Sequence, residues 1–125
     1  MRWLVFFILA LTAVGCGQKP DEVVKEGAKS VDSWKKTLEM VCRQWAEYRV
    51  PTLYMKQTLK AAEEVLSNEL QDLEKLGSNQ EAQKVVRKIH RLRYWIESHQ
   101  KDLGNADAAK RREILMAIPS NEEGS

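Results

Sequence analysis

The sequence predicts an all-α protein: a small antiparallel three-helix bundle of the coiled-coil-like kind, with a short fourth helix at its C-terminal end. After Pro20 the apolar residues recur at steps of three and four, which is the heptad pattern of packed helices. No segment alternates apolar and polar residues as a strand does, and Gly and Pro are nearly absent inside the segments. The chain has 125 residues, of which 30% are charged and 43% hydrophobic. This composition fits one small folded domain and excludes a fully disordered chain.

The first helix is expected at about 21–49 and the second at about 52–76, with boundary errors of two to four residues. The apolar stripe of the first comprises Val31, Trp34, Leu38, Val41, Trp45 and Tyr48. The stripe of the second comprises Met55, Leu59, Ala62, Leu66, Leu73 and Leu76, and Glu69 interrupts it. Trp34 and Trp45 are therefore expected in the core.

The junction at Pro51 has two interpretations. In the first, a tight turn precedes a new helix that has Pro51 at its first position. In the second, one long helix is kinked at Pro51, which costs about 3 kcal/mol. The turn is favoured because it covers the stripe of the first helix within one chain. The kinked helix would need a second copy of the chain, so it predicts an oligomeric coiled coil.

The third helix is expected at about 80–103 and the fourth at about 106–117. The stripe of the third comprises Ala82, Val85, Ile89, Leu92, Ile96, His99 and Leu103. Gly77-Ser78-Asn79 predicts a helix end followed by a new cap, and Gly104-Asn105 predicts the same. Pro119 closes the last apolar run, and residues 119–125 are expected to be a disordered tail.

The start of the chain has the order of a secretory signal. Arg2 supplies a positive charge, residues 3–14 form a 12-residue apolar or small stretch, and small residues follow. A helix of that length reaches about 18 Å, which is short of the ~30 Å hydrocarbon core of a bilayer. We therefore expect a cleaved leader rather than a transmembrane helix.

The leader ends in Ala13-Val14-Gly15-Cys16, which resembles the lipobox of bacterial lipoproteins. The resemblance covers residues 1–16 only, and Ala13 departs from it because leucine is commoner there. It implies signal cleavage between Gly15 and Cys16, a diacylglycerol on the Cys16 thiol, and acylation, as with palmitate, of the new amino terminus. Two or three acyl chains anchor a protein firmly, whereas one does not. The alternative is an ordinary secretory signal that happens to contain a cysteine.

The resemblance also implies a location and a division of the chain. Gly17 resembles the outer-membrane default of the family's sorting rule, which implies an outer-membrane protein facing the periplasm if the host has two membranes. The expected parts are a signal peptide at 1–15, a lipidated cysteine and tether at 16–20, the bundle at 21–118 and the tail.

One side of the predicted third helix carries a basic-aromatic strip, and two further residues, His90 and Arg93, lie near its borders. The strip comprises Lys84, Arg87, Lys88, Arg91, Tyr94 and Trp95. Residues 79–112 hold nine basic and four acidic side chains, a local charge of +5. Such a strip suits lipid phosphates, lipopolysaccharide or anionic glycan. We expect Trp95, which lies off the apolar seam, to be its contact residue.

The alternative interpretation of the strip is a solvated face that pairs with the acidic second helix. In an antiparallel hairpin centred near Ser78, Glu63 lies opposite Arg93 and Glu69 lies near Lys88. Lys84, Arg87 and Arg91 then have no obvious partner. Exposed pairs of this kind contribute only about 0.2–1 kcal/mol each.

The remaining chemistry-bearing residues favour structural roles. His99 is expected to be a core or core-edge histidine, and His90 lies about 180° from it around the helix, so the two cannot share one metal. Cys42 is expected to be a small buried hydrophobe, and a bridge between two chains is its alternative. The sequence contains no metal, cofactor or nucleophile motif. Its net charge of +2 gives no general reason to expect nucleic acid.

Together these patterns predict a membrane-anchored envelope lipoprotein with a non-catalytic helical interaction domain. Its expected partners are the membrane, through acylated Cys16, and another envelope protein, with a homo-oligomer in the kinked-helix case. The alternative is a lipid-anchored binder of anionic envelope ligands (lipopolysaccharide, anionic lipid or peptidoglycan) through the basic-aromatic strip.

Overall fold

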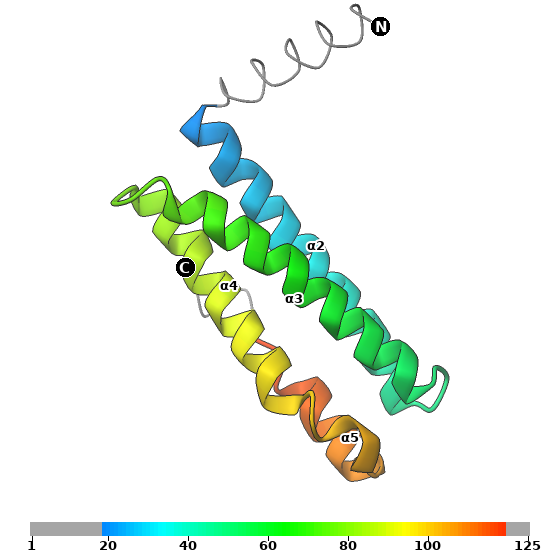
Figure 1. Cartoon of the computed structure of the whole chain (residues 1–125). Helices are drawn as coiled ribbons and strands as arrows, with labels where there is room; N and C mark the ends of the chain where they lie inside the picture. The colour runs from blue at the N-terminus through cyan, green and yellow to red at the C-terminus, as the bar shows by residue number, and fades with distance from the viewer. Residues whose placement is uncertain (1–18, 120–125) are drawn as a thin grey trace, which may run out of the picture.

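The computed structural model describes residues 19–119. The predicted signal peptide, Cys16 and residues 120–125 of the predicted tail lie outside this range. The described part contains α2 (Pro20–Ala46), α3 (Thr52–Glu74), α4 (Gln80–His99), the 3-10 turn η1 (Leu103–Asn105) and α5 (Ala108–Met116). The three long helices run alternately up and down, and α5 packs against α2 at one end (Figure 1). The predicted all-α bundle is confirmed.

The apolar stripes of the helices meet in one hydrophobic core. The largest wholly buried side chains are those of Trp45, Leu38, Met55, Leu59, Leu66, Leu73, Ile89, Ile96, Leu103 and Ile114. No polar or charged residue of the range 19–119 is buried. Leu70 takes the core position beside Glu69, and Trp34 packs only half-buried at the edge of the core. No helix within residues 19–119 is long and apolar enough to cross a membrane.

A tight turn joins α2 to α3, as the favoured interpretation of Pro51 predicts. Pro51 has extended backbone (ψ 156°) and directly precedes α3, so it is the cap rather than the first helical residue. The helix α2 ends at Ala46, three residues before its predicted end. The residue before a proline is sterically biased away from the helical region, so α2 has to end before Val50.

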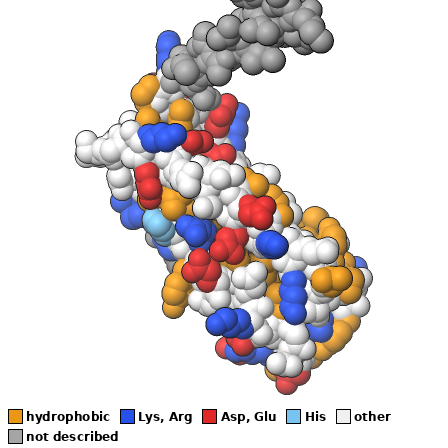
Figure 2. All heavy atoms as spheres, viewed as in Figure 1, with side chains coloured by type: hydrophobic (Ala, Val, Ile, Leu, Met, Phe, Trp, Pro, Cys, Tyr) orange, Lys and Arg blue, Asp and Glu red, His pale blue; other side chains and the backbone are white. Residues whose placement is uncertain are grey.

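The early end of α2 makes the core prediction for Tyr48 wrong. Tyr48 leaves the helix with a φ of 61°, in the left-handed region that a non-glycine residue rarely adopts. Its side chain is 60% exposed. Tyr48 therefore lies at the surface of the turn, and hydrophobic and basic side chains gather over that end of the bundle (Figure 2).

The turn between α3 and α4 follows its sequence signals. Gly77 adopts a φ of 62°, which suits glycine after a helix end. The Asn79 Oδ1 atom accepts a hydrogen bond from the Ala82 backbone N–H at 3.1 Å and so caps α4. The predicted cap at residues 77–79 is confirmed.

The end of α4 differs from its prediction. The helix ends at His99 rather than at residue 103, although Leu103 is wholly buried as the stripe requires. The cap of α5 is Asp107, whose Oδ1 atom accepts from the Lys110 N–H at 2.8 Å, and not Gly104-Asn105. Those two residues continue the 3-10 turn instead.

Glu69 lies half-buried between α3 and α2, and its environment disfavours its charge. Burial raises the pKa of its carboxyl group above the usual 4.5, the nearby Asp72 and Glu26 raise it further, and a hydrogen bond from Ser30 lowers it. The folded chain therefore holds the proton more tightly than the unfolded chain does. Stability from this group is gained as the pH falls through the folded pKa, and it is absent at neutral pH.

We expect Glu69→Gln to raise the free energy of unfolding at pH 7 by less than about 1 kcal/mol, since solvent screens a partly exposed group. The difference from the parent chain should vanish below pH 4.5, where both side chains are neutral. Urea unfolding at pH 7 and pH 4 measures this, with the exposed Glu64→Gln as control. A stabilisation that is equal at both pH values would contradict the argument.

Candidate functional site

The basic-aromatic strip of α4 is only partly a surface. Lys84, Arg87 and Tyr94 are exposed, and Tyr94 is 74% exposed. Lys88 and Arg91 are half-buried. Five of the six residues of the strip are thus at least partly exposed on one side of α4, and the sixth is Trp95.

Trp95 is buried, so the expectation that it would be the exposed contact residue is wrong. Its side chain is 3% exposed, and its Nε1 atom donates a hydrogen bond to the Ile114 carbonyl oxygen at 3.0 Å. The His99 ring lies 5.9 Å from the Trp95 ring, centroid to centroid. The α5 segment covers the off-seam side of α4, which periodicity within α4 alone does not reveal.

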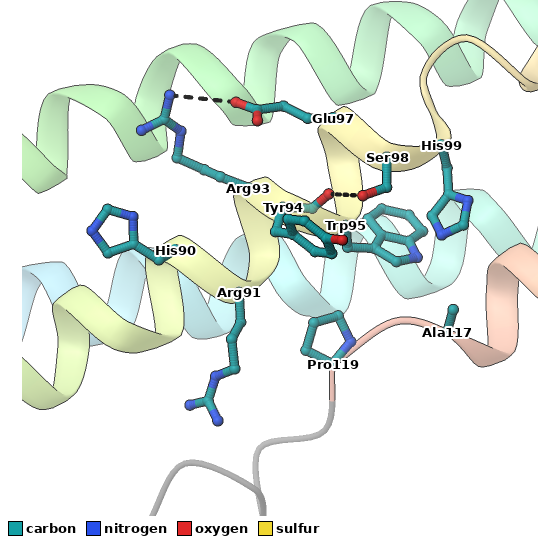
Figure 3. Close-up of a pocket in the computed structure, with 10 residues that line it drawn as sticks. All are labelled: His90, Arg91, Arg93, Tyr94, Trp95, Glu97, Ser98, His99, Ala117 and Pro119. Carbon is teal, nitrogen blue, oxygen red and sulfur yellow. Dashed lines mark hydrogen bonds and ion pairs between the residues drawn. The ribbon is translucent and has the colours of Figure 1, made fainter.

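A pocket of about 830 Å³ lies between the second half of α4 and the residues that follow α5. Its lining includes His90, Arg91, Arg93, Tyr94 and Ser98 from α4, together with Ala117 and Pro119 after α5. In Figure 3, Tyr94 stands between Arg91 and the helix end that carries His99, and Pro119 lies across from it. Two arginines, two histidines (His90 and His99) and the acidic Glu97 therefore border one open hollow together with the Tyr94 ring.

Two nitrogen atoms at this pocket are left without hydrogen-bond partners. Within residues 19–119, Arg93 Nε and His99 Nδ1 are buried and make no hydrogen bond. His99 itself is half-buried, which agrees with the predicted core-edge position. No group of three His, Cys, Asp or Glu residues in the described range is placed to hold a metal.

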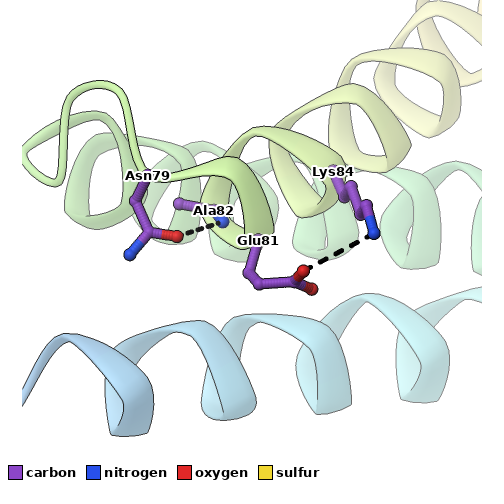
Figure 4. A network of polar contacts seen from close by, with 4 residues as sticks. All are labelled: Asn79, Glu81, Ala82 and Lys84. Atoms are coloured by element: carbon purple, nitrogen blue, oxygen red, sulfur yellow. Dashed lines mark hydrogen bonds and ion pairs between the residues drawn. The ribbon is translucent and has the colours of Figure 1, made fainter.

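The charged pairs differ from those predicted across the hairpin. Arg93 Nη2 lies 3.7 Å from Glu97 Oε1 on its own helix rather than pairing with Glu63. Lys84 Nζ lies 3.5 Å from Glu81 Oε1, so it has the partner that the sequence did not suggest (Figure 4, beside the Asn79 cap).

Glu69 also departs from its predicted partner. It interacts with Asp72 on α3 and with Glu26 and Ser30 on α2, rather than with Lys88. Of the charges that were expected to link α3 to α4, Arg93 is paired within its own helix, a contact worth only a few tenths of a kcal/mol, and Glu69 faces α2.

A second charged feature lies at the same end of the bundle, where α2 turns into α3, and the sequence did not predict it. The Arg111 guanidinium carbon lies 4.6 Å from the Trp45 ring centroid and 4.0 Å from that of Tyr48. Its Nη1 atom donates to the Trp45 carbonyl oxygen at 2.7 Å, and its Nε atom donates to the Ala106 carbonyl oxygen at 3.2 Å. A cation at the C-terminal end of α2 also complements the helix dipole. No local pattern around Arg111 indicates a contact 66 residues away.

Cys42 is a wholly buried residue of the core, as predicted, and it is a free thiol. Its burial gives no access for the alternative, a bridge between chains. Burial raises the pKa of the thiol from 9.0 to about 12, because the thiolate would lose its solvation.

We expect the Cys42 thiol to react with a thiol reagent very slowly in the folded protein at pH 8. At that pH roughly one molecule in ten thousand carries the reactive thiolate, and the sulfur is shielded as well. Timed reaction of a Cys16→Ala chain measures it, and unfolding in guanidinium should restore the rate of an ordinary thiol. A fast reaction in buffer would show that the core opens readily at this position.

No protein family, no curated protein and no solved structure matches the chain.

Proposed function

We propose that the chain is a lipid-anchored bacterial envelope protein whose helical bundle is a non-catalytic docking domain for another envelope component. The observation that carries the proposal is the order of residues 1–16: a charge, a 12-residue apolar stretch, and Cys16 directly after Val14-Gly15. This order resembles the signal of bacterial lipoproteins.

The start of the bundle supports this proposal. The helix α2 begins at Pro20, four residues after Cys16, so acyl chains on Cys16 would hold the bundle by one end. Attachment to a membrane raises the local concentration of a domain near its partners, into the millimolar range for short tethers. A weak contact between helical surfaces would then be sufficient.

Intact mass and fractionation of the protein made in a bacterium test the proposal. The expected mass is that of residues 16–125 plus a diacylglycerol and an amide-linked acyl chain, and the protein should sediment with the envelope. Cys16→Ala should abolish both results, whereas the matched control Cys42→Ala should keep them. An unmodified Cys16 thiol, or a retained leader, would overturn the proposal.

A second candidate function is binding of an anionic ligand at α4. The specific observation in its favour is the pocket that Arg91, Arg93 and Tyr94 border. Binding of lipopolysaccharide, anionic lipid and peptidoglycan fragments tests it. Salt-sensitive binding that Arg91→Gln weakens would support it, and salt-independent binding would count against it.

A further inference from the structure

The end of the bundle where α2 turns into α3 exposes large apolar side chains. Tyr48, Leu53 and Tyr54 are 60%, 65% and 48% exposed, and they fall within seven residues. They make up half of the six large hydrophobic side chains exposed in the described range. We call residues 43–60 the distal end. Single exposed apolar residues are common, whereas a group of them marks a contact surface.

The distal end is also the basic part of the first hairpin. It carries Arg43, Arg49, Lys56 and Lys60 against one acidic residue, Glu47, so its charge is +3. The following stretch 61–76 carries five acidic residues and Lys75, so its charge is −4. The Arg49 Nε atom lies 3.2 Å from Glu47 Oε2. This ion pair leaves Arg43, Lys56 and Lys60 without an acidic residue to balance them within the distal end. Positive charge and apolar surface thus coincide at one end of α3.

The turn that presents these side chains is held in one conformation. The Trp45 Nε1 atom donates to Thr52 Oγ1 at 3.1 Å across the turn, and Arg111 stacks on Tyr48. These contacts hold Tyr48 in a backbone region that tyrosine disfavours. A surface that is already ordered loses little conformational entropy when it binds.

We propose that the distal end binds an anionic lipid bilayer, with Leu53 and Tyr54 entering the headgroup region. Tyrosine is enriched at the membrane–water interface because its ring is apolar and its hydroxyl is polar. Lys56 and Lys60 follow these side chains on α3 and are exposed, so they can contact lipid phosphates. The complementarity of a positive end to a negative surface selects an anionic bilayer over a zwitterionic one.

This binding is separate from the acyl anchor. The 27 residues of α2 span about 40 Å, so the distal end lies about that far from Pro20. The inference goes beyond the proposed function because Cys16 plays no part in it. A chain without residues 1–16 therefore tests it alone, and every core residue of the described part lies within 31–114.

Co-sedimentation of residues 17–125 with vesicles is the experiment. Vesicles of phosphatidylglycerol mixed with phosphatidylcholine should bind the chain, vesicles of phosphatidylcholine alone should not, and added salt should weaken the binding. Lys56→Gln with Lys60→Gln should lower the partition coefficient about thirty-fold. Leu53→Ser with Tyr54→Ser should lower it about tenfold.

Matched variants separate the distal end from general attraction. Lys25→Gln with Lys29→Gln removes the same charge from exposed positions near the start of α2, and it should leave the partition unchanged. Circular dichroism checks that each variant keeps its helices. No binding to anionic vesicles, or an equal loss with the Lys25 and Lys29 pair, would overturn the inference. Equal binding to both kinds of vesicle would do the same.

Discussion

Replacing Trp95 with alanine is expected to lower the free energy of unfolding by about 3–5 kcal/mol, the usual loss for a buried tryptophan. That loss is a large share of the total free energy of unfolding of a typical domain, which is about 5–15 kcal/mol. The indole is 3% exposed, and its loss leaves a cavity between α4 and α5. It also leaves the Ile114 carbonyl oxygen without the hydrogen bond that Trp95 Nε1 donates. Chemical denaturation followed by circular dichroism measures the loss.

Two further variants separate the ring from its hydrogen bond. Trp95→Phe keeps most of the apolar contact and should lose only about 1–3 kcal/mol, from the unpaired carbonyl. Tyr94→Ala, at the exposed neighbouring position, should change stability by no more than about 0.5 kcal/mol. If the Trp95 and Tyr94 variants were equally stable, the burial of the indole under α5 would be refuted.

Arg111→Ala is expected to produce the second largest effect, a loss of about 2–3 kcal/mol. The variant removes two hydrogen bonds to backbone carbonyl groups and the stacking on Trp45 and Tyr48. Each charged hydrogen bond contributes about 1.5–3 kcal/mol in a favourable setting, and the loss here is less than their sum because the side chain is only half-buried. Urea unfolding and amide exchange of residues 106–116 measure the effect.

The lysine variant tests whether geometry or charge matters. Arg111→Lys keeps the charge but not the planar fork that reaches two carbonyl groups, so most of the loss should remain. Arg112→Ala, at the exposed neighbouring position, is the control and should be nearly neutral. Full recovery of stability in the lysine variant would mean that the helix dipole, rather than the stacking, is the main contribution.

The sequence was sufficient to predict the helices and most core residues, because both depend on the spacing of apolar residues along one chain segment. Leu38, Leu59 and Ile89 lie where the three-four step places them, and a new helix begins directly after Pro51. The predictions are wrong where packing against a segment distant in the sequence determines whether a side chain is buried. Trp95 lies off the seam of α4, and only the position of α5 makes that side an interior.

The candidate site was harder to predict for the same reason. Arg111 meets Trp45 across 66 residues, and no local pattern reports such a contact. Leu53 and Tyr54 did carry a usable signal, since they are apolar residues off the stripe beside a turn. The lipid anchor stays a prediction, because Cys16 lies outside the described residues.

The bond between Arg111 and the end of α2 has a consequence for the order of assembly. The hairpin of α2 and α3 closes a short loop and needs nothing that follows it, whereas α5 joins partners made much earlier in synthesis. Long loops close later because ordering them loses more chain entropy. Residues 106–119 should therefore dock last, and until they do, the indole rings of Trp45 and Trp95 in a nascent chain are exposed to water.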